Sequence, residues 1–107
     1  MITVANIRHD KNGVYIGRAM PRQGLTGSPL GNPYKLGPGD ERAAVIARYA
    51  EWLDARLEDE TSDQAREMAR LVELARSGAL TLLCWCAPET CHGDVIKARI
   101  EVRQEEA

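Results

Sequence analysis

Three cysteines and a histidine lie close together near the C-terminal end of the sequence. They occur in residues 84–92, which read Cys-Trp-Cys-Ala-Pro-Glu-Thr-Cys-His. Thiolate and imidazole groups bind zinc and act as nucleophiles or bases. The segment overlaps an apolar run, residues 79–86, that is typical of a strand buried on both faces. Apolar residues at helical spacing follow from about 92 to 102. We expect a strand, a turn that carries the cysteines, and then a helix.

One interpretation of this segment is a structural zinc site. The candidate ligands form a Cys₃His set: Cys84, Cys86, Cys91 and His92. On a straight strand the sulfurs of Cys84 and Cys86 would lie about 6 to 7 Å apart, which is wide for one ion. The strand would therefore have to curl at Trp85. In this interpretation the protein is a zinc-stabilised interaction module without catalysis.

A second interpretation is a catalytic site at the start of the last helix. Cys91, His92 and Asp94 lie where free backbone N–H groups and the helix dipole stabilise a thiolate and bind anions. Cys91 would be the nucleophile, with His92 or Asp94 as its proton-transfer partner. A third interpretation makes Cys84 and Cys86 small buried core residues, and for Cys84 alone we favour it.

A long loop is the second feature that suits a binding site. Residues 13–39 contain seven of the nine glycines and four of the five prolines, which excludes a regular helix. The candidate ligand contacts are basic, hydroxyl, amide and aromatic side chains: Arg18, Arg22, Ser28, Asn32, Tyr34 and Lys35. No established phosphate-binding motif is present, so a proline-stiffened loop that only covers the sheet is the alternative.

The remaining pattern predicts one α/β domain over residues 1–107. Residues 2–7 and 14–16 read as strands, and Asn12-Gly13 between them predicts a hairpin. One helix is expected over 41–58 with Asp40 as its N-cap, and a second between the N-cap Ser62 and Gly78. Residues 103–107 read as a frayed tail.

We expect a small Rossmann-like sheet of three to four strands with helices packed on it. Ligands of such sheets bind beyond the carboxyl ends of the strands, to which residues 14–16 and 82–84 would both point if they are parallel.

Composition narrows the classes of function. The net charge is −2, but residues 1–42 carry +3 and the rest −5. This distribution suits a small anionic ligand and argues against nucleic acid, which usually meets a strongly basic face. No apolar run approaches the roughly 20 residues that span a membrane, and no signal peptide is evident. The odd number of cysteines, three, does not suit a secreted disulfide framework, so we expect a cytoplasmic protein.

The two segments together resemble a known family. Val14-Tyr15-Ile16-Gly17-Arg18, the run from Ser28 to Tyr34, and Cys84-Trp85-Cys86 with Cys91-His92-Gly93-Asp94 are similar to the DUF4326 family of small bacterial and phage proteins. The similarity spans about residues 13–98 and implies no established activity. Our leading hypothesis is a domain whose basic loop holds a nucleotide or another phosphorylated small molecule beside Cys91, His92 and Asp94, and either hydrolyses or sequesters it.

Overall fold

The fold is that of a computed structural model, which describes residues 1–34, 41–87 and 89–106. One parallel sheet contains three strands in the order β1-β3-β2. The strands are β1 (Ile2–Asn6), β2 (Val14–Tyr15) and β3 (Leu80–Cys84). The α-helices are α1 (Arg42–Glu58), α2 (Asp63–Ser77) and α3 (His92–Glu106), and a short 3₁₀ helix covers Pro21–Gln23. The protein therefore has the mixed α/β fold that the sequence predicts.

The predicted hairpin between the first two strands is wrong. β1 and β2 each pair in parallel with β3, the most apolar strand, so β3 has its backbone satisfied on both sides. Residues 7–13 cross the face of β3 that carries Thr81 and Leu83. A Cβ on Gly13 would lie 2.6 Å from the Thr81 carbonyl oxygen, so only glycine allows this close crossing. The expected parallel orientation of β2 and β3 is confirmed, with Val14 opposite Leu82.

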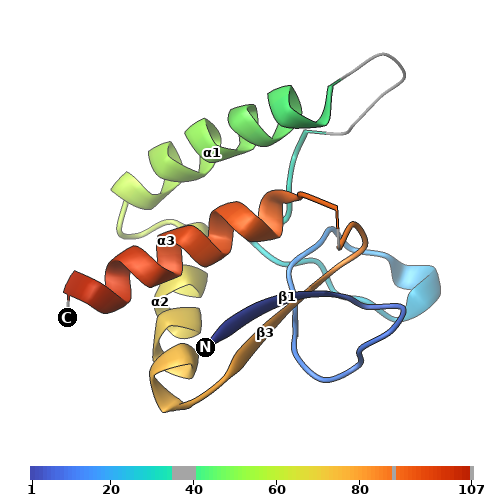
Figure 1. The fold of residues 1–107 in the computed structure, drawn as a ribbon. Coiled ribbons are helices and arrows are strands. Elements are labelled where there is room, and N and C mark those ends of the chain that lie inside the picture. Colours follow the sequence, from blue (N-terminus) through green and yellow to red (C-terminus); the bar gives the residue numbers. More distant parts are fainter. Residues whose placement is uncertain (35–40, 88, 107) are drawn as a thin grey trace.

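The helices cover the other face of the sheet (Figure 1). α2 and α3 pack on β3, and α3 also packs on β1, whereas α1 packs mainly on α2 and α3. The buried face of α1 consists of Val45, Tyr49 and Leu53, at the spacing expected for an amphipathic helix. Tyr49, Leu53 and Leu30 join a core that includes Leu82, Ile96 and Ile100. None of the helices in the described ranges is long and apolar enough to cross a membrane.

The helix ends agree in part with the sequence pattern. Ser62 caps α2, because its side chain accepts a hydrogen bond from the backbone N–H of Ala65. Asp40, the expected cap of the first helix, lies outside the described residues. The tail predicted from residue 103 is helical up to Glu106, and Ala107 lies outside the described residues. Residues 103–106 are Arg, Gln, Glu and Glu, which are good helix formers, and neither Gly nor Pro interrupts them, so α3 continues to Glu106. The last strand ends at Cys84 rather than residue 86.

Candidate functional site

A cavity of about 160 Å³ opens at the carboxyl ends of β2 and β3. Because the two strands are parallel, the segments that leave them lie at the same edge of the sheet. The first turns of α1 and α3 close the remaining sides. Seven lining residues are ones that the sequence singled out: Arg18, Asn32, Tyr34, Cys84, Cys86, Cys91 and His92. The glycine-rich segment and the Cys/His turn therefore meet in one site.

His92 connects the two halves of this site. Its Nε2 lies 2.8 Å from the carbonyl oxygen of Ile16, which only accepts, so Nε2 carries the proton. When the ring is neutral, Nδ1 is the acceptor. Burial lowers the pKa of His92 below its ordinary value, and the nearby charge of Arg18 lowers it further. The ring packs edge-on against Tyr49, with 5.2 Å between centroids. His92 is therefore a neutral, fixed imidazole at pH 7.

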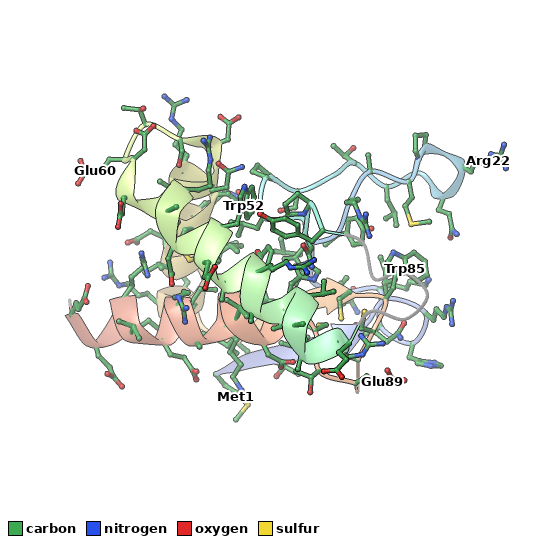
Figure 2. The ribbon with its side chains drawn as sticks, turned by 90° about the horizontal axis from the view of Figure 1, so that it is seen from above. Met1, Arg22, Trp52, Glu60, Trp85 and Glu89 are labelled. Carbon is green, nitrogen blue, oxygen red and sulfur yellow. The ribbon has the colours of Figure 1, made fainter. Side chains whose placement is uncertain are left out.

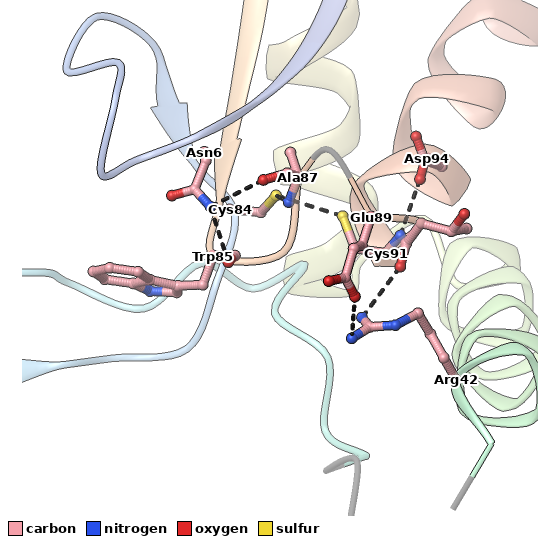
Figure 3. A network of polar contacts seen from close by, with 9 residues as sticks. Asn6, Arg42, Cys84, Trp85, Ala87, Glu89, Cys91 and Asp94 are labelled. Atoms are coloured by element: carbon pink, nitrogen blue, oxygen red, sulfur yellow. Dashed lines mark hydrogen bonds and ion pairs between the residues drawn. The ribbon is translucent and has the colours of Figure 1, made fainter.

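Cys84 and Cys91 form a buried pair of thiols (Figure 3). Their Sγ atoms lie 3.5 Å apart, and the S–H of Cys91 donates to the sulfur of Cys84. This hydrogen bond, with backbone N–H groups of Ala87 and Cys86, lowers the pKa of Cys84 to about 6. The same contact and burial raise the pKa of Cys91. The sequence pointed to Cys91 as the thiolate because of its place at the helix start; the structure instead makes Cys84 the more acidic thiol.

Asp94 and Cys91 together cap α3. The carboxylate of Asp94 accepts the backbone N–H of Cys91 at 2.9 Å, and the sulfur of Cys91 accepts the backbone N–H of Gly93 at 3.3 Å. This reciprocal arrangement resembles a capping box, with cysteine in place of serine and with Gly93 rather than Asp94 as the backbone donor to the cap. Asp94 is exposed and is not among the residues that line the cavity. The expected role of Asp94 in proton transfer therefore stays a prediction, and its observed contact is with the helix start.

Asn6 holds the turn that follows β3. Its side-chain amide donates to the carbonyl oxygens of Trp85 and Ala87, at 3.1 and 3.0 Å. The guanidinium of Arg8 lies over the Trp85 ring at 5.5 Å, a cation–π distance. Both contacts come from the end of β1 and the residues just after it, and Figure 3 shows the contacts of Asn6. The turn thus has a fixed shape, which positions Cys84 and Cys86 on the cavity wall.

Apart from the Cys84 thiolate, the charged side chains of the cavity wall are basic. Arg18 and Arg42 line it, and none of the lining residues in the described part of the chain is Asp or Glu. Arg42 forms an ion pair with Glu89 at 2.9 Å and donates to the carbonyl of Thr90 at 3.3 Å (Figure 3). Arg18 is exposed at the rim. Hence the site offers one partly neutralised guanidinium and one solvated guanidinium to an anion.

Two predicted ligand contacts, Arg22 and Ser28, do not line this cavity. Arg22 is exposed on the 3₁₀ helix, at the end of the molecule away from the helices (Figure 2). The hydroxyl of Ser28 accepts the backbone N–H of Leu30 at 3.1 Å, which shapes the loop. Lys35 lies outside the described residues. Asn32 lines the cavity, but its side-chain oxygen accepts the backbone N–H of Tyr34 at 2.8 Å, a loop-shaping contact.

Five lining residues were not among the predicted ligand, catalytic or metal contacts: Gly17, Arg42, Val45, Ile46 and Trp85. Arg42 and Ile46 lie on the first turns of α1, where the sequence pattern is that of an ordinary amphipathic helix. The position of Trp85 between two cysteines could have indicated a site residue. An aromatic residue after an apolar strand is, however, also typical of the hydrophobic core. The packing of α1 over the strand ends brings Arg42, Val45 and Ile46 to the site.

The four candidate zinc ligands are only partly gathered. Across residues 1–34, 41–87 and 89–106, no group of three or more His, Cys, Asp or Glu side chains is arranged to hold a metal ion. Cys84 and Cys91 are in contact, whereas His92 turns its Nε2 to the Ile16 carbonyl. The described geometry is therefore a thiol pair with a separate imidazole rather than a tetrahedral set.

The fold and site define a small α/β domain with a cysteine- and arginine-lined cavity at the carboxyl edge of a parallel sheet. The chain belongs to the family described as "Domain of unknown function (DUF4326)", whose model matches residues 3–102. This agrees with the resemblance in the sequence and extends it through β1 and most of α3. No curated protein and no solved structure matches the chain.

Proposed function

We propose that the protein binds a small phosphorylated molecule, of the nucleotide or sugar-phosphate class, in the cavity at the strand ends. The observation that carries the proposal is the pair of guanidinium groups in the wall: Arg18 and Arg42 line it, and none of the described lining residues is Asp or Glu. Arginine recognises phosphate by charge-assisted, often bidentate hydrogen bonds. An anion is therefore the ligand that this wall favours.

The size of the cavity indicates how such a ligand would lie. A volume of about 160 Å³ resembles the cavity of about 150 Å³ that holds a single benzene ring. Whole drug-sized ligands occupy about 300 to 1,000 Å³. One ring of the ligand, a base or a sugar, would therefore enter between Tyr34, Val45 and Trp85. The phosphate would remain at the rim, where the guanidinium of Arg18 is exposed.

The position of the cavity also supports the proposal. In open α/β sheets, including Rossmann-like folds, ligands bind beyond the carboxyl ends of parallel strands. We interpret this three-stranded sheet as a reduced member of that group, although β1 and β2 are joined without a helix in the described chain. A cytoplasmic location would suit the three free cysteines, because reducing compartments keep thiols reduced.

A thermal-shift screen with nucleotides, nucleotide-sugars and sugar phosphates tests the proposal. A ligand at ten times its Kd adds about 1.4 kcal/mol of stability and raises the Tm by about 5 °C or more. Arg18→Ala should lose most of the shift. Arg22→Ala, from the same segment but outside the cavity, is the matched control and should keep it. Absence of stabilisation by every compound, or equal loss in both variants, would overturn the proposal.

Hydrolysis and sequestration predict different fates for a ligand identified in this way. ³¹P NMR of the ligand, incubated with a tenth of its concentration of protein, distinguishes them. New phosphorus resonances that accumulate with time indicate hydrolysis. Unchanged resonances, together with a saturable thermal shift, indicate sequestration.

A further inference from the structure

We propose that Cys84 and Cys91 are a redox-active pair that a small peroxide converts into a disulfide in the wall of the cavity. The observation behind this proposal is the 3.5 Å distance between the two sulfurs, which come from the end of β3 and the start of α3. Both thiols are buried and both line the cavity. The proposal goes beyond ligand binding and does not depend on it.

The distance requires only a small movement to form the bond. A disulfide has an S–S length of about 2.05 Å, so the sulfurs must approach by about 1.5 Å. Residues 85–90 join the two cysteines, and Asn6 holds the carbonyl oxygens of Trp85 and Ala87 in the first part of this segment. Because Cys91 also caps α3 through Gly93, bond formation changes the cap and the cavity wall together.

The surroundings of the two thiols assign them different roles. The sulfur of Cys84 receives the backbone N–H of Ala87 at 3.4 Å and the S–H of Cys91. These donors stabilise a negative charge on Cys84, and the thiolate is the form that attacks peroxide. Cys91 keeps its proton as the donor in this contact. Cys84 is therefore the attacking thiol and Cys91 the resolving thiol.

Hydrogen peroxide supplies the oxidising equivalents, and the reaction balances in two steps. The Cys84 thiolate attacks one peroxide oxygen and forms a sulfenic acid, while the O–O bond breaks and the released hydroxide takes a proton to give water. The Cys91 sulfur then attacks the Cys84 sulfur and displaces hydroxide, which leaves as a second water with the Cys91 proton. The sum is two thiols and one peroxide to one disulfide and two waters.

Access to the pair is through the cavity. Cys84 is 1% exposed and Cys91 is 2% exposed, so large reagents cannot reach them from outside. A peroxide is close to water in size, and the cavity of about 160 Å³ that both residues line admits it. Cys86 lines the same cavity and is half-buried, so it is the competing thiol that any test must separate.

The test uses purified full-length protein, first reduced and freed of reductant, then treated with one equivalent of hydrogen peroxide. Intact mass spectrometry should show loss of two hydrogen atoms in the wild type and equally in Cys86→Ser. Cys84→Ser and Cys91→Ser should lack this product, and circular dichroism checks that each variant is folded. Dithiothreitol should restore the original mass.

Chymotryptic digestion without reduction locates the bond. Cleavage after Trp85 separates Cys84 from Cys86 and Cys91, so a Cys84–Cys91 bond in Cys86→Ser holds two fragments together until dithiothreitol is added. Failure of Cys86→Ser to lose two hydrogen atoms would overturn the proposal. So would a wild-type product that disappears in Cys86→Ser, because Cys86 would then be the partner. Neither result bears on whether a phosphorylated ligand binds.

Discussion

The indole Nε1 of Trp85 donates a hydrogen bond to the hydroxyl of Tyr15 at 3.0 Å. The same hydroxyl donates to the carbonyl oxygen of Arg18 at 2.7 Å. Tyr15 is the last residue of β2, Trp85 follows β3, and Arg18 begins the loop at the cavity rim. One phenol thus links the turn after β3 to the segment that leaves β2, and its position determines where the Arg18 backbone lies.

Replacing Tyr15 by Phe should destabilise the protein by about 1 kcal/mol. The change removes both hydrogen bonds of the Tyr15 hydroxyl, and the half-buried indole N–H of Trp85 loses this acceptor. Urea denaturation measures the change. The double variant Tyr15→Phe, Trp85→Phe should cost less than the sum of the two single changes, since each removes the same contact. Strict additivity would show that the Trp85–Tyr15 hydrogen bond contributes nothing.

Gly93 provides a second prediction, in which packing opposes helix propensity. A Cβ at this position would lie 2.9 Å from Val4 Cγ1 and 3.0 Å from Ile16 Cδ1. Gly93→Ala should therefore destabilise by about 1 to 3 kcal/mol, although alanine is the better helix former by about 1 kcal/mol. Ala98→Gly, at an exposed position of α3, should destabilise by about 1 kcal/mol through propensity alone. Thermal unfolding that shows stabilisation by Gly93→Ala would contradict the close packing of α3 on the strands.

The sequence predicted those parts of the fold that local patterns determine. β3 is a continuous apolar run, and Val45, Tyr49 and Leu53 repeat at helical spacing, so both elements were placed close to their observed bounds. The hairpin prediction failed because Asn12-Gly13 is a local turn signal, whereas strand pairing depends on where β3 lies. A two-residue strand such as β2 carries too little pattern to decide its own partner.

The candidate site was likewise predictable only where residue type and local position determine it. The types of Cys91 and His92, and their place at a helix start, pointed to chemistry, and both line the cavity. Arg42 was missed because its approach to the strand ends depends on how α1 packs. The acidity of Cys84 was missed because it depends on a contact between two residues that sit at the end of a strand and the start of a helix. Neither relationship is visible in residue spacing.

Ser62 allows a prediction with a matched control on the same helix. Its buried hydroxyl accepts from the backbone N–H of Ala65 and donates to the carbonyl of Arg56 at 2.8 Å, which joins the end of α1 to the start of α2. Ser62→Ala should cost about 1 to 2 kcal/mol. Ser77→Ala, an exposed serine at the other end of α2, should change stability by less than about 0.5 kcal/mol. Equal losses in urea denaturation would show that Ser62 has no special role.

The Cys84–Cys91 contact predicts a specific dependence on pH. In Cys86→Ser the thiolate absorbance at 240 nm should titrate near pH 6, because the pKa of Cys84 is lowered to about 6 chiefly by the S–H of Cys91. Removal of this donor in Cys86→Ser, Cys91→Ala should raise the pKa of Cys84 toward the ordinary value of a thiol. An unchanged titration would show that Cys91 does not set the acidity of Cys84.

The same pKa shift affects stability, with a sign that follows from proton binding. Between pH 6 and the ordinary thiol pKa of 9.0, the folded Cys84 is ionised while the unfolded one still holds its proton. The free energy of unfolding of Cys86→Ser should therefore rise with pH across this window and lose that contribution as pH falls through about 6. The double variant with Cys91→Ala should show a flatter rise, measured by urea denaturation at pH 6, 7.5 and 9. His92 titrates in both proteins, and Cys91 holds its proton in both the folded and unfolded states well below pH 9. The difference between the two curves from pH 6 to 7.5 therefore isolates Cys84, and parallel curves there would refute the thiol pair as its cause.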